Sequence, residues 1–217
     1  MTEHTIAATT HGRYLVSSPN GSEPAPLLVG FHGYGEGADV QLDRLRAIPG
    51  SEAWVTVSIQ GLHRFYQRRT NEVIASWMTR QDREHAIADN LAYVSAALEQ
   101  ISRDMATLPR VVFAGFSQGV AMAFRAAAAS ARPVGGLIAV GGDVPPEIGV
   151  ESLARIGSAL VCRGARDPLY APATFENDLR RLRDSSVTVT PLEFDGGHEW
   201  SAPVLDAAST FLSERRR

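Results

Sequence analysis

Short apolar runs recur along the chain, separated by segments with helical periodicity. Residues 111–114 and 137–140 are continuously apolar and lack the polar alternation of a half-exposed strand. Such runs are typical of strands in a parallel sheet that helices cover on both faces. The segments that predict strands are 13–17, 26–31, 54–59, 110–116, 136–140, 159–163 and 187–194. The first and last of these alternate more than the others, so we expect them at the two edges of the sheet.

Amphipathic helical patterns lie between these strands. The clearest runs over 80–103, where apolar residues recur every three or four positions, at Ile87, Leu91, Val94, Leu98 and Ile101. Thr79 and Asp82 predict a capping box at its start. Further helices are predicted over 118–131, 172–183 and 202–214. Alternating strands and helices imply right-handed parallel crossovers, so we predict an α/β fold with an open, doubly wound, mostly parallel sheet.

Composition narrows the class of protein. The chain has 217 residues, of which 44% are hydrophobic and 21% charged, and these values fit one globular domain over 1–217 rather than a disordered or collagen-like chain. The net charge is −3, and the basic residues are all arginines scattered along the chain. A polyanion-binding protein clusters its basic residues, so we expect no nucleic-acid partner.

Neither a targeting segment nor a membrane span is visible in the sequence. Residues 1–10 lack the basic start and the apolar stretch of a secretory signal, and no apolar run approaches transmembrane length. We therefore predict a cytoplasmic protein without stable membrane insertion. Cys162, the single cysteine, lies in an apolar run, which predicts a buried thiol in a strand rather than a nucleophile.

The strongest local signal is a GxSxG sequence at 115–119, directly after the strand predicted over 110–116 and directly before an alanine-rich helical stretch. A strand, a sharp turn and a helix are the setting of a nucleophile elbow, in which a serine oxygen projects from a strained turn. Gly115 and Gly119 then have a steric role, because they let the strand and the helix approach closely. Ser117 is the predicted nucleophile, and the alternative is a serine that only caps the helix.

A serine hydroxyl needs a neighbouring base, and the base needs a third group that orients it. His198 lies in a glycine-containing loop before the last predicted helix, and Asp167 directly follows the sixth predicted strand. The order serine, aspartate, histidine along the chain is that of α/β hydrolases. We therefore predict Ser117, Asp167 and His198 as the catalytic residues. Asp143, after an earlier strand, and Asp195, in the loop of His198, are rivals for the acid.

Acyl transfer also needs two N–H donors for the developing oxyanion. The backbone N–H of Gln118, the residue after the serine, is the first predicted donor. The second is predicted at Tyr34, in the glycine-rich loop 32–37. A phosphate-binding loop is the competing functional interpretation, but the glycine spacing differs from such loops and the chain has no lysine. A plain turn is the structural alternative. We assign His32 to loop packing, because His198 is the better candidate for the base.

Together these motifs resemble the phospholipase/carboxylesterase family of α/β hydrolases, which includes acyl-protein thioesterases and small bacterial carboxylesterases. HGYGE at 32–36 is similar to the family's HGxGD oxyanion loop, and GFSQG at 115–119 is similar to its nucleophile sequence. GARDPLY at 164–170 and GGHEW at 196–200 resemble its acid and histidine loops. The resemblance spans nearly the whole chain. It implies an α/β-hydrolase fold and a small ester or acyl-thioester substrate, and we expect a reaction without metal or cofactor.

Departures from the family pattern bear on the substrate. Glu36 replaces the usual aspartate, Tyr34 stands where leucine is common, and 78–79 stand where an aromatic residue and an acid are typical. The resemblance places Trp77 near the family's acyl pocket and so predicts a substrate contact, with a core tryptophan as the alternative. The segment 63–69 mixes aromatic residues with positive charge, and it is either an exposed loop or part of a site for an anionic or amphiphilic ester.

We therefore predict a serine hydrolase that cleaves carboxylic esters through an acyl-enzyme. The same triad attacks thioesters and acyl-glycerol esters, so an acyl-thioesterase or a lysophospholipase is the alternative within the hydrolases. The alternative from another class is an α/β-hydrolase-fold protein that binds a ligand without catalysis. Acyl-chain length, leaving group and oligomeric state stay open.

Overall fold

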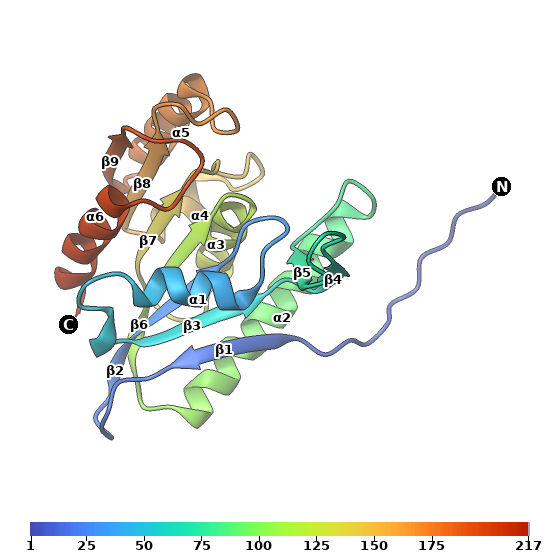
Figure 1. The fold of residues 1–217 in the computed structure, drawn as a ribbon, viewed down its shortest axis with the longest axis horizontal. Coiled ribbons are helices and arrows are strands. Elements are labelled where there is room, and N and C mark those ends of the chain that lie inside the picture. The colour runs from blue at the N-terminus through green and yellow to red at the C-terminus, as the bar shows by residue number, and fades with distance from the viewer. Residues whose placement is uncertain (217) are drawn as a thin grey trace.

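A seven-stranded sheet forms the centre of the molecule in a computed structural model that describes residues 1–216 (Figure 1). Its strand order is β1-β3-β2-β6-β7-β8-β9. Within the described residues, β1 is antiparallel to its neighbour β3 and the other neighbours pair in parallel. The strands are β1 (Arg13–Ser17), β2 (Ala25–Phe31), β3 (Val55–Gln60), β6 (Thr107–Phe116), β7 (Val134–Val140), β8 (Ser158–Gly164) and β9 (Thr188–Phe194). The predicted strands and the predicted edge positions are confirmed.

Helices cover both faces of this sheet. In Figure 1, α1 and α6 lie in front of the sheet and α2 and α3 behind it. One core cluster joins the sheet to α2, α3, α4 and α5, and a second joins its other face to α1 and α6. The helices are α1 (Ala38–Arg46), α2 (Arg83–Asp104), α3 (Gln118–Ala129), α4 (Val150–Ala154), α5 (Pro172–Asp184) and α6 (Ala202–Ser213), with a short 3₁₀ helix at Ser51–Ala53.

The continuous apolar runs follow from this arrangement. Successive side chains of a strand point to opposite faces of a sheet, so Leu28 lies in the cluster with α1 and α6 while its neighbour Val29 lies in the other. Val112 and Phe113 divide between the two clusters in the same way. The central strands therefore need apolar residues on both faces, as the sequence pattern indicated.

A small two-stranded sheet stands beside the main one. It pairs β4 (His63–Tyr66) with β5 (Val73–Ser76) in an antiparallel hairpin. All of β4 is exposed. The segment 63–69 is therefore exposed, but part of it is a strand, because β5 supplies the ladder partner. Gly35 N–H donates to Ala75 O at 3.0 Å, which joins the hairpin to the loop after β2.

One local expectation is wrong, and two helices were not predicted. The capping box at the start of α2 is wrong: Asp82 has the left-handed backbone conformation, with φ 51°, and makes no side-chain cap hydrogen bond. The Thr79 hydroxyl instead donates to Gln81 O at 3.0 Å. Helices α1 and α4 were not predicted.

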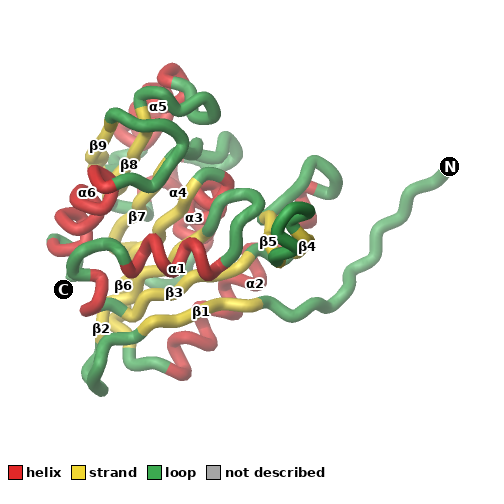
Figure 2. Tube along the Cα trace, viewed as in Figure 1, coloured by secondary structure: helices red, strands yellow, loops and turns green. Residues whose placement is uncertain are grey.

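Residues 1–12 form no helix or strand and extend away from the sheet (Figure 2). In the part described, no helix combines the length and the apolar character that crossing a bilayer requires.

Candidate active site

The predicted catalytic residues lie in loops at one edge of the sheet. Because β2, β6, β7, β8 and β9 form a parallel array, their carboxyl ends meet at the same edge. Ser117 follows β6, Asp167 lies just beyond β8 and His198 lies just beyond β9. Ligands of open α/β sheets bind at this edge.

Ser117 occupies a strained turn between β6 and α3. Its backbone angles are φ 52° and ψ −121°, which a non-glycine residue rarely adopts, and its N–H donates to Val140 O at 2.9 Å. A methyl group at Gly119 would lie 2.1 Å from Phe31 O, and one at Gly115 would lie 2.5 Å from Gly119 O. The steric role predicted for the two glycines is confirmed, since side chains there would force the strand and helix apart.

Asp167 and His198 form a hydrogen-bonded pair. His198 Nδ1 lies 2.8 Å from Asp167 Oδ2, and the other carboxylate oxygen accepts the N–H groups of Leu169 at 2.8 Å and Tyr170 at 3.1 Å. Burial alone would raise the pKa of Asp167, but these hydrogen bonds outweigh it and hold the pKa below its ordinary value. An ionised carboxylate only accepts, so Nδ1 carries the proton and Nε2 of the neutral ring is free to accept one.

The rival acids stand elsewhere. Asp143 is exposed, and within residues 1–216 it makes no side-chain hydrogen bond to His198. Asp195 is also exposed and pairs with Arg166. Of the three candidates, Asp167 is therefore the carboxylate in contact with the imidazole.

Ser117 and His198 lie in the same neighbourhood. The ring of Phe116, the residue before the serine, packs against the His198 ring with a centroid separation of 5.0 Å. A methyl group at Gly141 would lie 3.1 Å from His198 Cε1, and one at Gly142 would lie 2.5 Å from Ser117 O. No hydrogen bond joins Ser117 Oγ to His198 Nε2 in the described residues. Ser117 therefore lies near the His198–Asp167 pair without being hydrogen-bonded to the imidazole.

The two predicted oxyanion donors have free N–H groups. Neither Tyr34 N–H nor Gln118 N–H donates a hydrogen bond within residues 1–216. The Gln118 side chain, in contrast, is fully engaged: its Oε1 accepts Trp77 N–H at 3.0 Å and its Nε2 donates to Met78 O at 3.1 Å. These hydrogen bonds connect the start of α3 to the residues that follow β5.

His32 and Trp77 belong to the core beneath the glycine-rich loop. His32 is fully buried, with Nδ1 donating to Gly33 O at 2.7 Å and Nε2 accepting Gly61 N–H at 3.0 Å. Burial lowers the pKa of His32 and keeps its ring neutral, which agrees with a packing role. Trp77 is also fully buried and donates its indole N–H to His32 O at 2.9 Å. As folded, Trp77 has no exposed surface with which to contact a substrate, and it occupies the core position that was the alternative.

Comparison with known proteins identifies the chain. Residues 13–215 match the family model Phospholipase/Carboxylesterase. The chain belongs to this family. It is accordingly a hydrolase of the esterase/thioesterase kind with the α/β-hydrolase fold. No curated protein sequence matches it.

Solved structures share the fold of this phospholipase/carboxylesterase family member at low sequence identity. Esterase PE8 is 21% identical, with 95% of this chain and 100% of that chain covered and a TM-score of 0.76. The Bacillus cereus carboxylesterase is 16% identical, covers 94% of each chain and has a TM-score of 0.72. Zea mays acyl-protein thioesterase 2 is 18% identical, with 94% and 99% covered and a TM-score of 0.70.

Two side chains that contact the candidate active site of this family member were not predicted from the sequence. One is the side chain of Gln118, for which only the backbone N–H had been considered. The other is Arg44 on α1, which contacts Glu36 and Phe116. A signal for α1 was present: Asp39 lies in its first turn and Arg44 and Arg46 in its last, the charge order that favours a helix.

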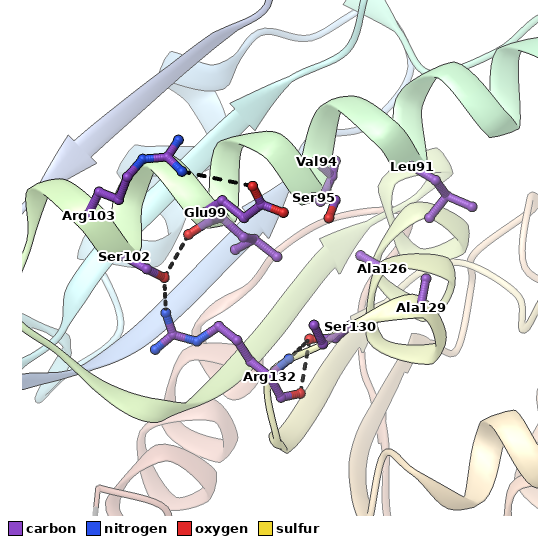
Figure 3. A pocket seen from close by; sticks show the side chains of 12 residues that line it. Leu91, Val94, Ser95, Glu99, Ser102, Arg103, Ala126, Ala129, Ser130 and Arg132 are labelled. Atoms are coloured by element: carbon purple, nitrogen blue, oxygen red, sulfur yellow. Dashed lines mark hydrogen bonds and ion pairs between the residues drawn. The ribbon is translucent and has the colours of Figure 1, made fainter.

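A cavity of about 230 Å³ lies away from the candidate active site, between α2 and α3 (Figure 3). Its walls include Leu91 and Val94 of α2 and Ala126 of α3, and Arg132 stands at one end. It is lined by the last turns of α3, whereas Ser117 precedes the first turn of that helix. None of the predicted site residues lines it.

Proposed function

We propose that this family member hydrolyses carboxylic esters through a covalent acyl-enzyme on Ser117. His198 is the general base and then the general acid, and Asp167 orients its ring. The observation that carries this proposal is the 2.8 Å contact between His198 Nδ1 and Asp167 Oδ2, at the sheet edge where Ser117 sits in a strained turn. Nucleophile, base and orienting group are the three parts that serine acyl transfer requires.

The acylation step follows from these roles. Ser117 Oγ attacks the ester carbonyl carbon while His198 Nε2 takes the hydroxyl proton. The carbonyl oxygen becomes an oxyanion and accepts hydrogen bonds from the free N–H groups of Tyr34 and Gln118. The bond to the leaving oxygen then breaks, His198 donates its proton to the departing alcohol, and the acyl group remains on Ser117.

Deacylation repeats the sequence with water. His198 Nε2 takes a proton from the attacking water, the hydroxide adds to the acyl carbon, and the same N–H groups hold the oxyanion. The proton returns to Ser117 Oγ as its bond to the acyl carbon breaks, and a carboxylic acid leaves. Asp167 stays ionised throughout and stabilises the imidazolium that forms twice in each turnover, consistent with its lowered pKa.

Substituting the nucleophile tests this proposal. The Ser117→Ala variant should lose the burst of p-nitrophenol from p-nitrophenyl acetate, lose fluorophosphonate labelling, and lose roughly 10⁶-fold in kcat. Ser95→Ala is the matched control, because Ser95 is exposed on α2, and it should behave as the unsubstituted enzyme. Full hydrolysis by Ser117→Ala would contradict the assignment, and absence of labelling in the folded wild-type protein would favour a non-catalytic binder.

A second candidate function is the hydrolysis of an amphiphilic ester or thioester. Tyr34 is 64% exposed and Phe65 is 37% exposed, and their rings pack together with centroids 5.9 Å apart. The pair forms an exposed aromatic surface between the proposed oxyanion loop, which carries Tyr34, and the β4–β5 hairpin, which carries Phe65. Apolar surface of this kind favours a long acyl chain over acetate. The resemblance in fold to Zea mays acyl-protein thioesterase 2 makes a thioester worth testing.

A substrate panel separates these candidates. p-Nitrophenyl esters from acetate to palmitate, together with one acyl-thioester and one lysophospholipid, should be compared by kcat/KM. If the aromatic surface binds acyl chains, Phe65→Ala raises KM for decanoate and longer esters and leaves acetate unchanged. An acetate preference that Phe65→Ala does not alter would assign the enzyme to small esters.

A further inference from the structure

Glu36 and Arg44 form a rigid ion pair behind the proposed oxyanion loop. Arg44 Nη1 donates to Glu36 Oε2 at 2.6 Å, and Nη2 donates to Oε1 at 2.7 Å. The side chains are only 19% and 21% exposed. Two parallel hydrogen bonds between a guanidinium and a carboxylate restrict the orientation of both groups, so the pair connects α1 firmly to the loop after β2.

The carboxylate of this pair also holds the loop backbone. Glu36 Oε2 accepts Gly33 N–H at 2.8 Å. Gly33 O, in turn, accepts from His32 Nδ1 at 2.7 Å and from Glu36 N–H at 3.4 Å. That carbonyl shares a planar peptide unit with Tyr34 N–H, so the contacts that fix its direction fix the direction of the N–H as well. The Glu36 carboxylate thus holds Gly33 through its N–H, while the His32 ring and the Glu36 backbone N–H hold the Gly33 carbonyl, which sets the direction of the Tyr34 N–H.

The guanidinium of the pair also contacts the nucleophile elbow. Arg44 Cζ lies 4.1 Å from the centre of the Phe116 ring, within the range of a cation–π contact. The same ring packs against His198 with centroids 5.0 Å apart. A methyl group at Gly33 would lie 3.0 Å from Glu36 Oε2 and 3.1 Å from Phe116 Cδ1. The ion pair therefore contacts the loop directly, and it reaches the base His198 only through the Phe116 ring.

The charges of the pair constrain how it can act. Burial by itself raises the pKa of Glu36, but the hydrogen bonds and the charge of Arg44, with the Gly33 N–H, hold it below the ordinary value. Glu36 is therefore a carboxylate close to the place where an oxyanion is to form. An unneutralised carboxylate there would repel the oxyanion, and the guanidinium removes that repulsion.

We propose that Glu36 and Arg44 act together as positioning residues. Glu36 orients the Tyr34 N–H toward the oxyanion. Arg44 neutralises the charge of Glu36 and holds the Phe116 ring in its packing against His198. This inference rests on the proposed function of Ser117. It concerns the transition state rather than substrate binding, because the Tyr34 N–H donates most strongly to the developing oxyanion.

Steady-state kinetics on Glu36→Gln, Arg44→Gln and the double variant test the proposal with a p-nitrophenyl ester. In Glu36→Gln and the double variant kcat should fall about 10- to 100-fold, with KM little changed. Arg44→Gln should lose more activity than the double variant, since it leaves the carboxylate without its neutralising partner. Arg46→Gln is the control, because Arg46 lies on the same helix, its side chain is 60% exposed and it pairs only distantly with Asp43, at 3.9 Å.

Affinity for an alkylboronic acid, which adds to a serine hydroxyl to give a tetrahedral anion, is the second readout. It should fall by the same factor as kcat in each variant, whereas a merely structural role would lower the melting temperature without this correlation. If Arg44→Gln does not fold, Arg44→Lys keeps the charge but not the paired hydrogen bonds, and it should show a smaller loss in kcat at unchanged KM.

Failure of the positioning role and failure of the proposed function give different results. Wild-type kcat and boronate affinity in folded Glu36→Gln and Arg44→Gln, with Ser117→Ala inactive, would overturn the positioning role and leave the proposed function intact. Activity that survives in Ser117→Ala would overturn the proposed function itself. A loss confined to KM would also overturn the inference, because it would assign the pair to substrate binding.

Discussion

At the scale of single residues, each oxygen of Asp167 has its own partners. One accepts backbone N–H groups of its own loop, and the other faces His198 Nδ1. Its side chain is 1% exposed, so the orientation of the imidazole depends on a carboxylate that solvent scarcely reaches. The distinction between Asp167 and its rivals is a matter of these contacts, since all three acids follow strands or lie in the histidine loop.

Asp167→Asn should therefore lower kcat by roughly 10³- to 10⁴-fold while leaving the fold unchanged. The amide can donate to Nδ1 and stabilise the tautomer with the proton on Nε2, which cannot act as a base. Ester hydrolysis and circular dichroism measured in parallel check both parts. Asp143→Asn is the control and should retain wild-type activity; if it carries the loss instead, the acid role belongs to Asp143.

At the scale of elements, Asp178 of α5 joins the loops that follow two neighbouring strands. Its Oδ2 accepts Val144 N–H, in the loop after β7, at 3.0 Å, and the Tyr170 hydroxyl, in the loop of Asp167, at 3.0 Å. Asp178 is 2% exposed. Burial raises the pKa of Asp178 above its ordinary value, although the hydrogen bonds from Val144 and Tyr170 oppose the shift.

A raised carboxyl pKa has a defined effect on stability. The folded state holds the Asp178 proton more tightly than the unfolded state, so the stability it contributes is present below the unfolded pKa of about 3.9 and is lost as pH rises through the folded pKa. Asp178→Asn keeps an acceptor oxygen and removes the titration. The free energy of unfolding of the wild type relative to Asp178→Asn should therefore fall between pH 4 and pH 7. Urea unfolding at both pH values measures it, and a difference independent of pH would contradict the prediction.

The same scale explains which elements were predictable. The strands of the main sheet and α2, α3, α5 and α6 have long apolar patterns that burial against the sheet requires. The β4–β5 hairpin and α4 lack such a pattern, because β4 is wholly exposed and α4 has only five residues. Their structure depends on neighbours: β4 needs β5, and the loop of Glu36 bridges to Ala75.

At the scale of the whole molecule, Cys162 reports on the integrity of the fold. It is fully buried in β8, in the core cluster between the sheet and α6, as the sequence predicted. Burial raises the pKa of the thiol well above its ordinary value, and the reactive species is the thiolate. Reaching it requires the separation of α6 from the sheet.

The native protein should therefore leave Cys162 unmodified by a thiol reagent such as Ellman's reagent, and one thiol per chain should react in denaturant. The labelling rate across a urea series should follow the unfolding transition seen by circular dichroism. Rapid labelling of the folded protein would contradict the burial of this strand, and Cys162→Ala provides the blank.

Sequence alone determined the strands of the main sheet, the helices α2, α3, α5 and α6, and the residues at the strand ends, because burial on both faces of a sheet demands apolar runs and a nucleophile elbow demands glycines around its serine. Only the tertiary structure placed Asp167, rather than Asp143 or Asp195, against His198, buried Trp77 in the core and brought Arg44 to Glu36. Those outcomes depend on contacts between segments far apart in the chain, and the directions of side chains across such contacts leave no periodic trace in the sequence.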